Sequence, residues 1–158
     1  MIKKMLPISI VCILIDQILK NIIDSRMVLN TTEPIIAGFF NISYVHNPGA
    51  AWSILNGNRL LLIAIAIFSL VLFYIYFIKN KHLSKLETIS YSILIGGIMG
   101  NLFDRIIYGY VIDYLDFMVF SYDFPVFNFA DICIVVSVGL IIIRMLIGGE
   151  NNAKLYSK

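Results

Sequence analysis

The chain has 158 residues, of which 59% are hydrophobic and only 14% are charged, and its mean hydropathy is +0.88. A soluble domain usually carries about 25% charged residues, so this composition excludes an ordinary water-soluble protein and indicates that lipid is the solvent. The net charge of +2 is too small to indicate nucleic-acid binding, and the sequence contains no glycine-rich phosphate loop.

One spanning helix needs about 20 apolar residues, so the length allows four spans with modest loops and predicts a single integral-membrane domain over residues 1–158. The first predicted span covers residues 5–23. Its basic start resembles a secretory signal, but no small-residue cleavage site follows, so we expect it to be retained. Asp16 and Lys20 lie four residues apart on one face, where we expect an ion pair with Lys20 extending to water.

The segment between the first and second spans is expected to form β-structure. Residues 35–45 are rich in β-branched and aromatic side chains, which predicts a short strand region on the membrane surface. An Asn-Pro-Gly sequence at 47–49 ends it, and the small residues there allow a close backbone approach. The second predicted span, residues 60–78, contains no charged residue at all.

The third predicted span, residues 87–107, combines close packing with a polar end. Gly96 and Gly100 have the Gly-x-x-x-Gly spacing that lets two helices approach closely. The polar end consists of Asn101, Asp104 and Arg105. Considered as packing alone, Asp104 and Arg105 are expected to form an ion pair.

An aromatic segment, residues 108–127, joins the third span to the fourth. The segment carries three acids: Asp113, Asp116 and Asp123. The fourth predicted span, residues 128–147, opens with Asn128 and Asp131, and a carboxylate near a helix N-terminus is stabilised by the helix dipole.

The distribution of charge predicts the orientation. Most basic residues lie before the first span, between the second and third, or at the end of the fourth, which is one side of the membrane for four crossings. By the positive-inside rule, both termini are expected in the cytoplasm. An ionisable group in a span costs about 2.5–3.5 kcal/mol at mid-helix and less near the ends, so a single pair could be tolerated. Polar groups of three spans at the same outer level are harder to explain by packing alone.

Acids at this outer level suggest a carboxylate pair that hydrolyses an amide. Asp113 and Asp131 are far enough apart along the chain for it to turn back and bring them together. Two carboxylates in contact share one proton, so one can activate water while the other protonates the substrate. Spacing alone leaves the choice open, because Asp116 and Asp123 compete with Asp113. The sequence lacks the His-Glu-x-x-His and Gly-x-Ser-x-Gly motifs of other hydrolases.

Five ordered blocks resemble the lipoprotein signal peptidase (signal peptidase II) family. They are Asp16-Gln17-x-x-Lys20, Asn47-x-Gly49-Ala50-Ala51-Trp52, Gly100-Asn101-x-x-Asp104-Arg105, Val111-x-Asp113-Tyr114 and Phe127-Asn128-x-Ala130-Asp131. Any one block is a weak signal, but five blocks in order with matching spacing are a strong one. The resemblance covers nearly the whole chain. Tyr114 departs slightly from the family pattern, in which phenylalanine is more common at this position.

The resemblance implies an all-α membrane protein with four spanning helices, a small extracytoplasmic β-cradle over residues 35–45, and an outer loop or helix over the site within residues 108–127. It also implies an intramembrane aspartic endopeptidase in which Asp113 and Asp131 are the catalytic pair. The residues expected to line or support the site are Asp16, Lys20, Asn47, Gly49, Asn101, Asp104, Arg105, Asn128 and Ala130.

The same resemblance implies the substrate and the setting. The enzyme would remove the signal peptide of a diacylglyceryl-modified bacterial prolipoprotein by cutting before the lipidated cysteine. We expect a monomer in the bacterial cytoplasmic (inner) membrane, in contact with membrane lipid, that binds globomycin-type inhibitors, needs no metal or cofactor and has no nucleic-acid partner.

Two other function classes fit the apolar composition less well. A small transporter or proton channel could use the ionisable groups as a relay, but transport sites usually lie near the bilayer midplane. Here the ionisable groups gather at one end of the spans. A purely structural membrane subunit would leave the outer polar blocks without a purpose.

Overall fold

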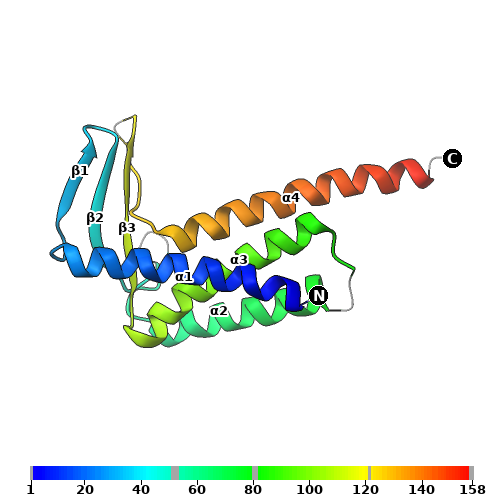
Figure 1. Ribbon diagram of the computed structural model, residues 1–158, viewed down its shortest axis with the longest axis horizontal. Helices are drawn as coiled ribbons and strands as arrows, with labels where there is room; N and C mark the ends of the chain where they lie inside the picture. Colours follow the sequence, from blue (N-terminus) through cyan, green and yellow to red (C-terminus); the bar gives the residue numbers. More distant parts are fainter. Residues whose placement is uncertain (1, 51–53, 80–81, 121, 157–158) are drawn as a thin grey trace.

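The computed structural model describes residues 2–50, 54–79, 82–120 and 122–156. Figure 1 shows long helices that run lengthwise and a small sheet that stands across one end of the bundle. The helices are α1 (Ile2–Arg26), α2 (Arg59–Phe73), α3 (Lys85–Ile107) and α4 (Phe129–Tyr156). The start of α1 and the end of α4 both lie at the end away from the sheet, as an even number of crossings requires.

The predicted spans are confirmed, with their ends shifted by only a few residues. Among the described residues, four helices are long and apolar enough to cross a bilayer: Ile2–Arg26, Arg59–Ile78, Lys85–Ile107 and Phe129–Ile147. The chain is therefore a multi-pass membrane protein. The second span ends in a π-helical turn, η2 (Tyr74–Ile78), and α3 starts with a capping box between Ser84 and Glu87.

The sheet is antiparallel, in the order β1-β2-β3-β4. Its strands are β1 (Thr32–Ile36), β2 (Phe40–Asn47), β3 (Val111–Val119) and β4 (Tyr122–Asp123). The β-structure expected over residues 35–45 is confirmed as part of a hairpin that turns at Gly38, where φ is +72°. The structure differs over residues 108–127, which are mainly strand rather than loop or helix, because the β-branched and aromatic residues of β3 pair with β2.

Close packing of α3 against α1 and α4 confirms the interpretation of the glycines. A Cβ atom on Gly100 would lie 2.5 Å from Oδ2 of Asp16 on α1, and one on Gly97 would lie 2.6 Å from the carbonyl oxygen of Ala130 on α4. A larger residue at Gly97 would therefore push α3 away from α4, and one at Gly100 would displace the carboxylate of Asp16. The remaining spanning helix, α2, buries only Leu62 fully, and most of its other side chains are exposed or half-buried.

The sheet packs on the C-terminal end of α1. Tyr44 of β2 and Ile112 and Tyr114 of β3 form a buried cluster against apolar residues of α1 that include Leu19 and Ile23. Because successive side chains of a strand point to opposite faces, Tyr114 turns toward α1 and Asp113 turns to the other face of the sheet. The packing of β3 on α1 thus determines where Asp113 points.

Candidate active site

Asp113 is a buried carboxylate on β3 of the sheet. Its Oδ2 accepts a hydrogen bond from Nδ2 of Asn47 on β2 at 2.9 Å, and its Oδ1 accepts one from Nδ2 of Asn128 at 2.7 Å. The side chain is 3% exposed. Burial, followed by the negative charge of Asp131, raises the pKa of Asp113 to about 7.

Asp131 lies in the first turn of α4. Its Oδ2 accepts from the backbone N–H of Asn128 at 3.1 Å, and its own N–H donates to Oδ1 of Asn128 at 3.1 Å. This reciprocal pair is a capping box, and it holds the carboxylate of Asp131 at the N-terminus of the helix. The remaining oxygen, Oδ1, accepts from Nδ2 of Asn101 at 2.8 Å.

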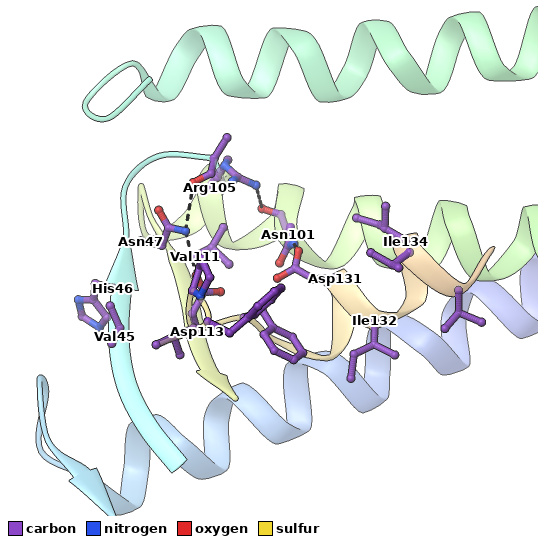
Figure 2. Close-up of a pocket in the computed structure, with 17 residues that line it drawn as sticks. Val45, His46, Asn47, Asn101, Arg105, Val111, Asp113, Asp131, Ile132 and Ile134 are labelled. Atoms are coloured by element: carbon purple, nitrogen blue, oxygen red, sulfur yellow. Dashed lines mark hydrogen bonds between the residues drawn. The ribbon is translucent and has the colours of Figure 1, made fainter. Parts of the chain in front are cut away.

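The two carboxylates face one cavity. Asp113 and Asp131 both line a space of about 710 Å³, and Figure 2 shows them with Asn47, Asn101 and Arg105 around it. The two rival acids of the sequence lie elsewhere in the sheet. Asp116 accepts hydrogen bonds from Ser43 and Asn41 on β2, and Asp123 is exposed on β4. Of the three acids in the segment, Asp113 is therefore the one beside Asp131.

A buried ionic network between α1 and α3 lies next to the two aspartates. Nζ of Lys20 lies 2.8 Å from Oδ2 of Asp16 and 2.8 Å from Oδ2 of Asp104, so one cation joins α1 to α3. The expected Asp16–Lys20 pair is confirmed, but the expectation that Lys20 extends to water was wrong, since Lys20 is 2% exposed. The second carboxylate on α3 explains the difference, because it compensates for the desolvation of the ammonium group.

Asn101 and Ala130 carry this network to the aspartates. Asn101 accepts from Lys20 at 2.8 Å through the same side chain that donates to Asp131. The backbone N–H of Ala130 donates to Oδ1 of Asp16 at 3.0 Å. The start of α4, which includes Asp131, is thus held by both α1 and α3.

Arg105 does not pair with its neighbour Asp104, contrary to the packing expectation. The carboxylate of Asp104 is taken by Lys20, and the guanidinium of Arg105 turns to the cavity instead. Nη2 of Arg105 donates to the carbonyl oxygen of Gly49 at 2.8 Å, and Nη1 donates to that of Asn101 at 3.3 Å. Gly49 in turn donates its N–H to Oδ1 of Asn47 at 2.9 Å. This bond orients the Asn47 amide, which donates to Asp113.

Among the expected site residues, all nine supporting residues lie in this network or beside the cavity, whereas Ala51 and Trp52 of the second block lie outside the described residues. Part of the aromatic segment also contributes. Residues 124–127 line the cavity, while Phe120 at the tip is fully exposed. Among the described residues, no group of three or more His, Cys, Asp or Glu side chains could hold a metal ion.

Two polar features were missed at the level of sequence. Nε2 of Gln17 donates to Oδ1 of Asp104 at 2.8 Å, and the position of this amide one residue after Asp16 in an apolar span was the available signal. Where β2 meets the end of α1, the hydroxyl of Tyr44 donates to Asp24 and bonds Nε2 of His46 at 2.8 Å. Burial is the main cause that raises the pKa of Tyr44 and lowers that of His46.

Comparisons with known proteins show the family of the chain. Residues 8–147 match the family described as signal peptidase (SPase) II. The chain is 40% identical over 138 residues to a lipoprotein signal peptidase of Halothermothrix orenii, an alignment that covers 87% of this chain and 92% of the relative. It is 37% identical over 145 residues to a lipoprotein signal peptidase of Staphylococcus aureus, covering 92% and 89%.

Solved structures give the same result. A bacterial membrane enzyme superposes with a TM-score of 0.86 at 35% sequence identity, over 96% of this chain and 92% of that one. A second bacterial membrane enzyme superposes with a TM-score of 0.82 at 36% identity, over 92% and 94% of the two chains. At these levels of identity and coverage the likeness extends to the family as well as to the fold.

Proposed function

The chain belongs to the signal peptidase (SPase) II family, and on that premise we propose that it is an intramembrane aspartic endopeptidase acting on bacterial prolipoproteins. The proposed substrate carries a diacylglyceryl group on the cysteine that follows the cleaved bond. The observation that carries the proposal is a pair of buried carboxylates, Asp113 and Asp131, which share one cavity and are bridged by Asn128.

The pair supplies the acid and the base that amide hydrolysis needs. Asp131 lies at the N-terminus of α4, where the helix dipole stabilises its ionised form, and it takes a proton from the attacking water. The pKa of Asp113, about 7, lets this residue hold the shared proton and donate it to the carbonyl oxygen as water bonds to the carbonyl carbon. When the C–N bond breaks, Asp131 gives its proton to the leaving amine and Asp113 regains one from the intermediate.

Arg105 is suited to hold the substrate backbone. Its Nε is buried and has no hydrogen-bond acceptor among the described residues, although the other two guanidinium nitrogens are bonded. An unsatisfied buried donor costs about 1–3 kcal/mol. A carbonyl oxygen of the bound peptide would accept from Nε and remove this cost.

The cavity also suits a substrate that is anchored in lipid. Val135 and Val136 of α4 line it and are 71% and 50% exposed on a helix that spans the bilayer. Acyl chains on the substrate cysteine can therefore stay in the hydrocarbon region while the bond before the cysteine reaches the aspartates at the helix end. Water reaches that boundary far more easily than the midplane.

We further propose that the protein lies in the bacterial cytoplasmic (inner) membrane with both termini in the cytoplasm and the sheet outside. The distribution of basic residues supports this orientation. The start of α1 and the end of α4 both lie at the end of the bundle away from the sheet, which also supports it (Figure 1). A monomer would suffice, since both carboxylates come from one chain, and globomycin-type inhibitors would occupy the same cavity.

The test is cleavage by the purified protein in detergent. A diacylglyceryl-modified prolipoprotein and its unlipidated twin are incubated with and without globomycin, and the released peptide is identified by mass spectrometry. We expect cleavage before the cysteine for the lipidated form only, and inhibition by globomycin. Asp113→Asn and Asp131→Asn should each abolish cleavage, whereas Asp123→Asn, which changes an exposed acid of the same outer segment, should not. Normal turnover by either site variant would refute the assignment of the pair.

A further inference from the structure

Arg59, the first residue of α2, makes two short hydrogen bonds to the end of another helix. Its Nε donates to the carbonyl oxygen of Arg105 at 2.7 Å, and its Nη2 donates to that of Ile106 at 2.6 Å. Both acceptors lie in the last turn of α3, where carbonyls lack helical partners. The chain turns away from the helix axis at Gly109, where φ is +89°. The N–H of Gly109 donates to the carbonyl oxygen of Asp104. The guanidinium of Arg59 thus acts as a C-terminal cap for α3.

This contact matters because packing holds the outer end of α2 only weakly. Leu62 is the one buried residue that α2 contributes, and its first turn is largely exposed, with Leu60 at 81% and Leu61 at 47%. The two hydrogen bonds from Arg59 therefore supply a directional link between the start of α2 and the end of α3.

The same link leads to the candidate active site by a continuous series of hydrogen bonds. The residue whose carbonyl oxygen accepts from Arg59 uses its own side chain, Nη2 of Arg105, to hold the carbonyl oxygen of Gly49 at 2.8 Å. Gly49 donates its N–H to Oδ1 of Asn47 at 2.9 Å, and Asn47 donates to Asp113 at 2.9 Å. The segment that enters α2 is thus attached near both of its ends to one residue, Arg105.

We propose that Arg59 is a positioning residue for catalysis: it fixes the end of α3 that carries Arg105 and thereby holds Asn47 against Asp113. Removing its guanidinium would free two carbonyl oxygens and loosen the last turn of α3. The contact from Arg105 to Gly49 would then weaken, and with it the orientation of the Asn47 amide. The inference rests on the proposed function, because peptide cleavage is its readout.

Arg59→Ala tests the proposal through kinetics. We expect kcat to fall about tenfold, since small displacements of catalytic groups have large effects on rate. A hydrogen bond from Asn47 favours the ionised form of Asp113, so its loosening should also move the alkaline limb of the pH–rate profile upward. Asn47→Ala should move that limb in the same direction, which identifies the route by which Arg59 acts.

Two further variants separate positioning from simple loss of charge or of packing. Arg59→Lys keeps the charge and can reach one of the two carbonyl oxygens, so it should recover part of the lost rate. Arg26→Ala removes an exposed arginine at the outer end of α1, and it should leave the kinetics and the profile unchanged. A double-mutant cycle of Arg59→Ala with Asn47→Ala should give less than the product of the two single effects, because both act on one series of contacts.

Wild-type kcat and an unshifted alkaline limb in Arg59→Ala would overturn the proposal. A loss of rate that leaves the limb in place and multiplies with Asn47→Ala would overturn it as well, because a structural role alone gives that result. If Arg59→Ala does not yield folded protein in detergent, the limb and the cycle are measured with Arg59→Lys, under the same criteria. Cleavage by Asp113→Asn would refute the proposed function instead, whatever the Arg59 variants do.

Discussion

Asn128 donates its side-chain amide to Oδ1 of Asp113 at 2.7 Å, while its backbone N–H donates to Oδ2 of Asp131 at 3.1 Å. One residue therefore bonds to both carboxylates. Its Oδ1 also accepts from the N–H of Asp131, which caps α4. The relative position of the pair and the start of the helix depend on the same side chain, and substitutions can separate the two roles.

Asn128→Ser should keep the cap and lose the bridge. A serine hydroxyl can still accept from the N–H of Asp131 but is too short to reach Asp113. We expect thermal stability close to that of the wild type and a fall in kcat of about 100-fold. Asn128→Ala should lose the cap as well and unfold at a lower temperature. Normal cleavage by Asn128→Ser would contradict the bridging role.

The rate of cleavage should fall on the alkaline side of neutrality. Asp113, with a pKa of about 7, must keep its proton to protonate the substrate, and the proton is lost as the pH rises through that value. We expect kcat/KM to decrease about tenfold per pH unit above this point. Cleavage of the lipidated substrate across a series of buffers measures the profile, and Asp123→Asn serves as the control. A rate that stays constant to strongly alkaline pH would contradict the assignment.

Asp113→Asn should stabilise the fold at neutral and alkaline pH. The pKa of Asp113 is raised from 3.8 to about 7, so the folded state binds more protons than the unfolded state between these values. The wild-type protein therefore loses stability as the pH rises through this interval, by an amount on the order of 2–4 kcal/mol. An asparagine does not titrate, so the melting temperature of the variant should exceed that of the wild type at pH 8 by more than at pH 5. The opposite trend would show that the carboxylate is stabilised by its surroundings.

Gly97→Ala should damage both stability and activity. The added Cβ would lie 2.6 Å from the carbonyl oxygen of Ala130, a backbone atom that cannot move without shifting α4 and Asp131. Gly139→Ala is the matched control on α4, because a Cβ there meets nothing within 4 Å. It should be neutral or stabilising by roughly 0.5–1 kcal/mol. Equal melting temperatures and rates for the two variants would contradict the close packing of α3 on α4.

The spans and the polar blocks could be predicted because each depends on local sequence. A run such as residues 60–78 has one way to satisfy its backbone in lipid, which is a helix. The Gly-x-x-x-Gly spacing in the third span likewise predicts close helix packing from only five residues. The order and spacing of the five blocks then indicated the family. The roles of the individual residues stay predictions until they are measured.

Partners across long sequence distances could not be predicted from the residues. Lys20 was expected to extend to water because its nearest acid, Asp16, was the visible partner, whereas Asp104 lies on another helix. Arg105 was expected to pair with Asp104 because this acid is next to it in the sequence, yet it bonds to the carbonyl oxygen of Gly49. The strand β3 was also missed as strand, since its pairing with β2 is set by tertiary structure and propensity alone is a weak guide.

The ionic network of Lys20 also places a condition on biogenesis. During synthesis α1 emerges before α3, so Lys20 enters the bilayer before its partner on α3 has been made. Asp16, one turn away on the same helix, is the counter-ion already in place, and the pair lowers the cost of inserting an ammonium group. The arrival of the third span then supplies Asp104 and locks α1 to α3, so assembly of the bundle is coupled to the burial of one lysine.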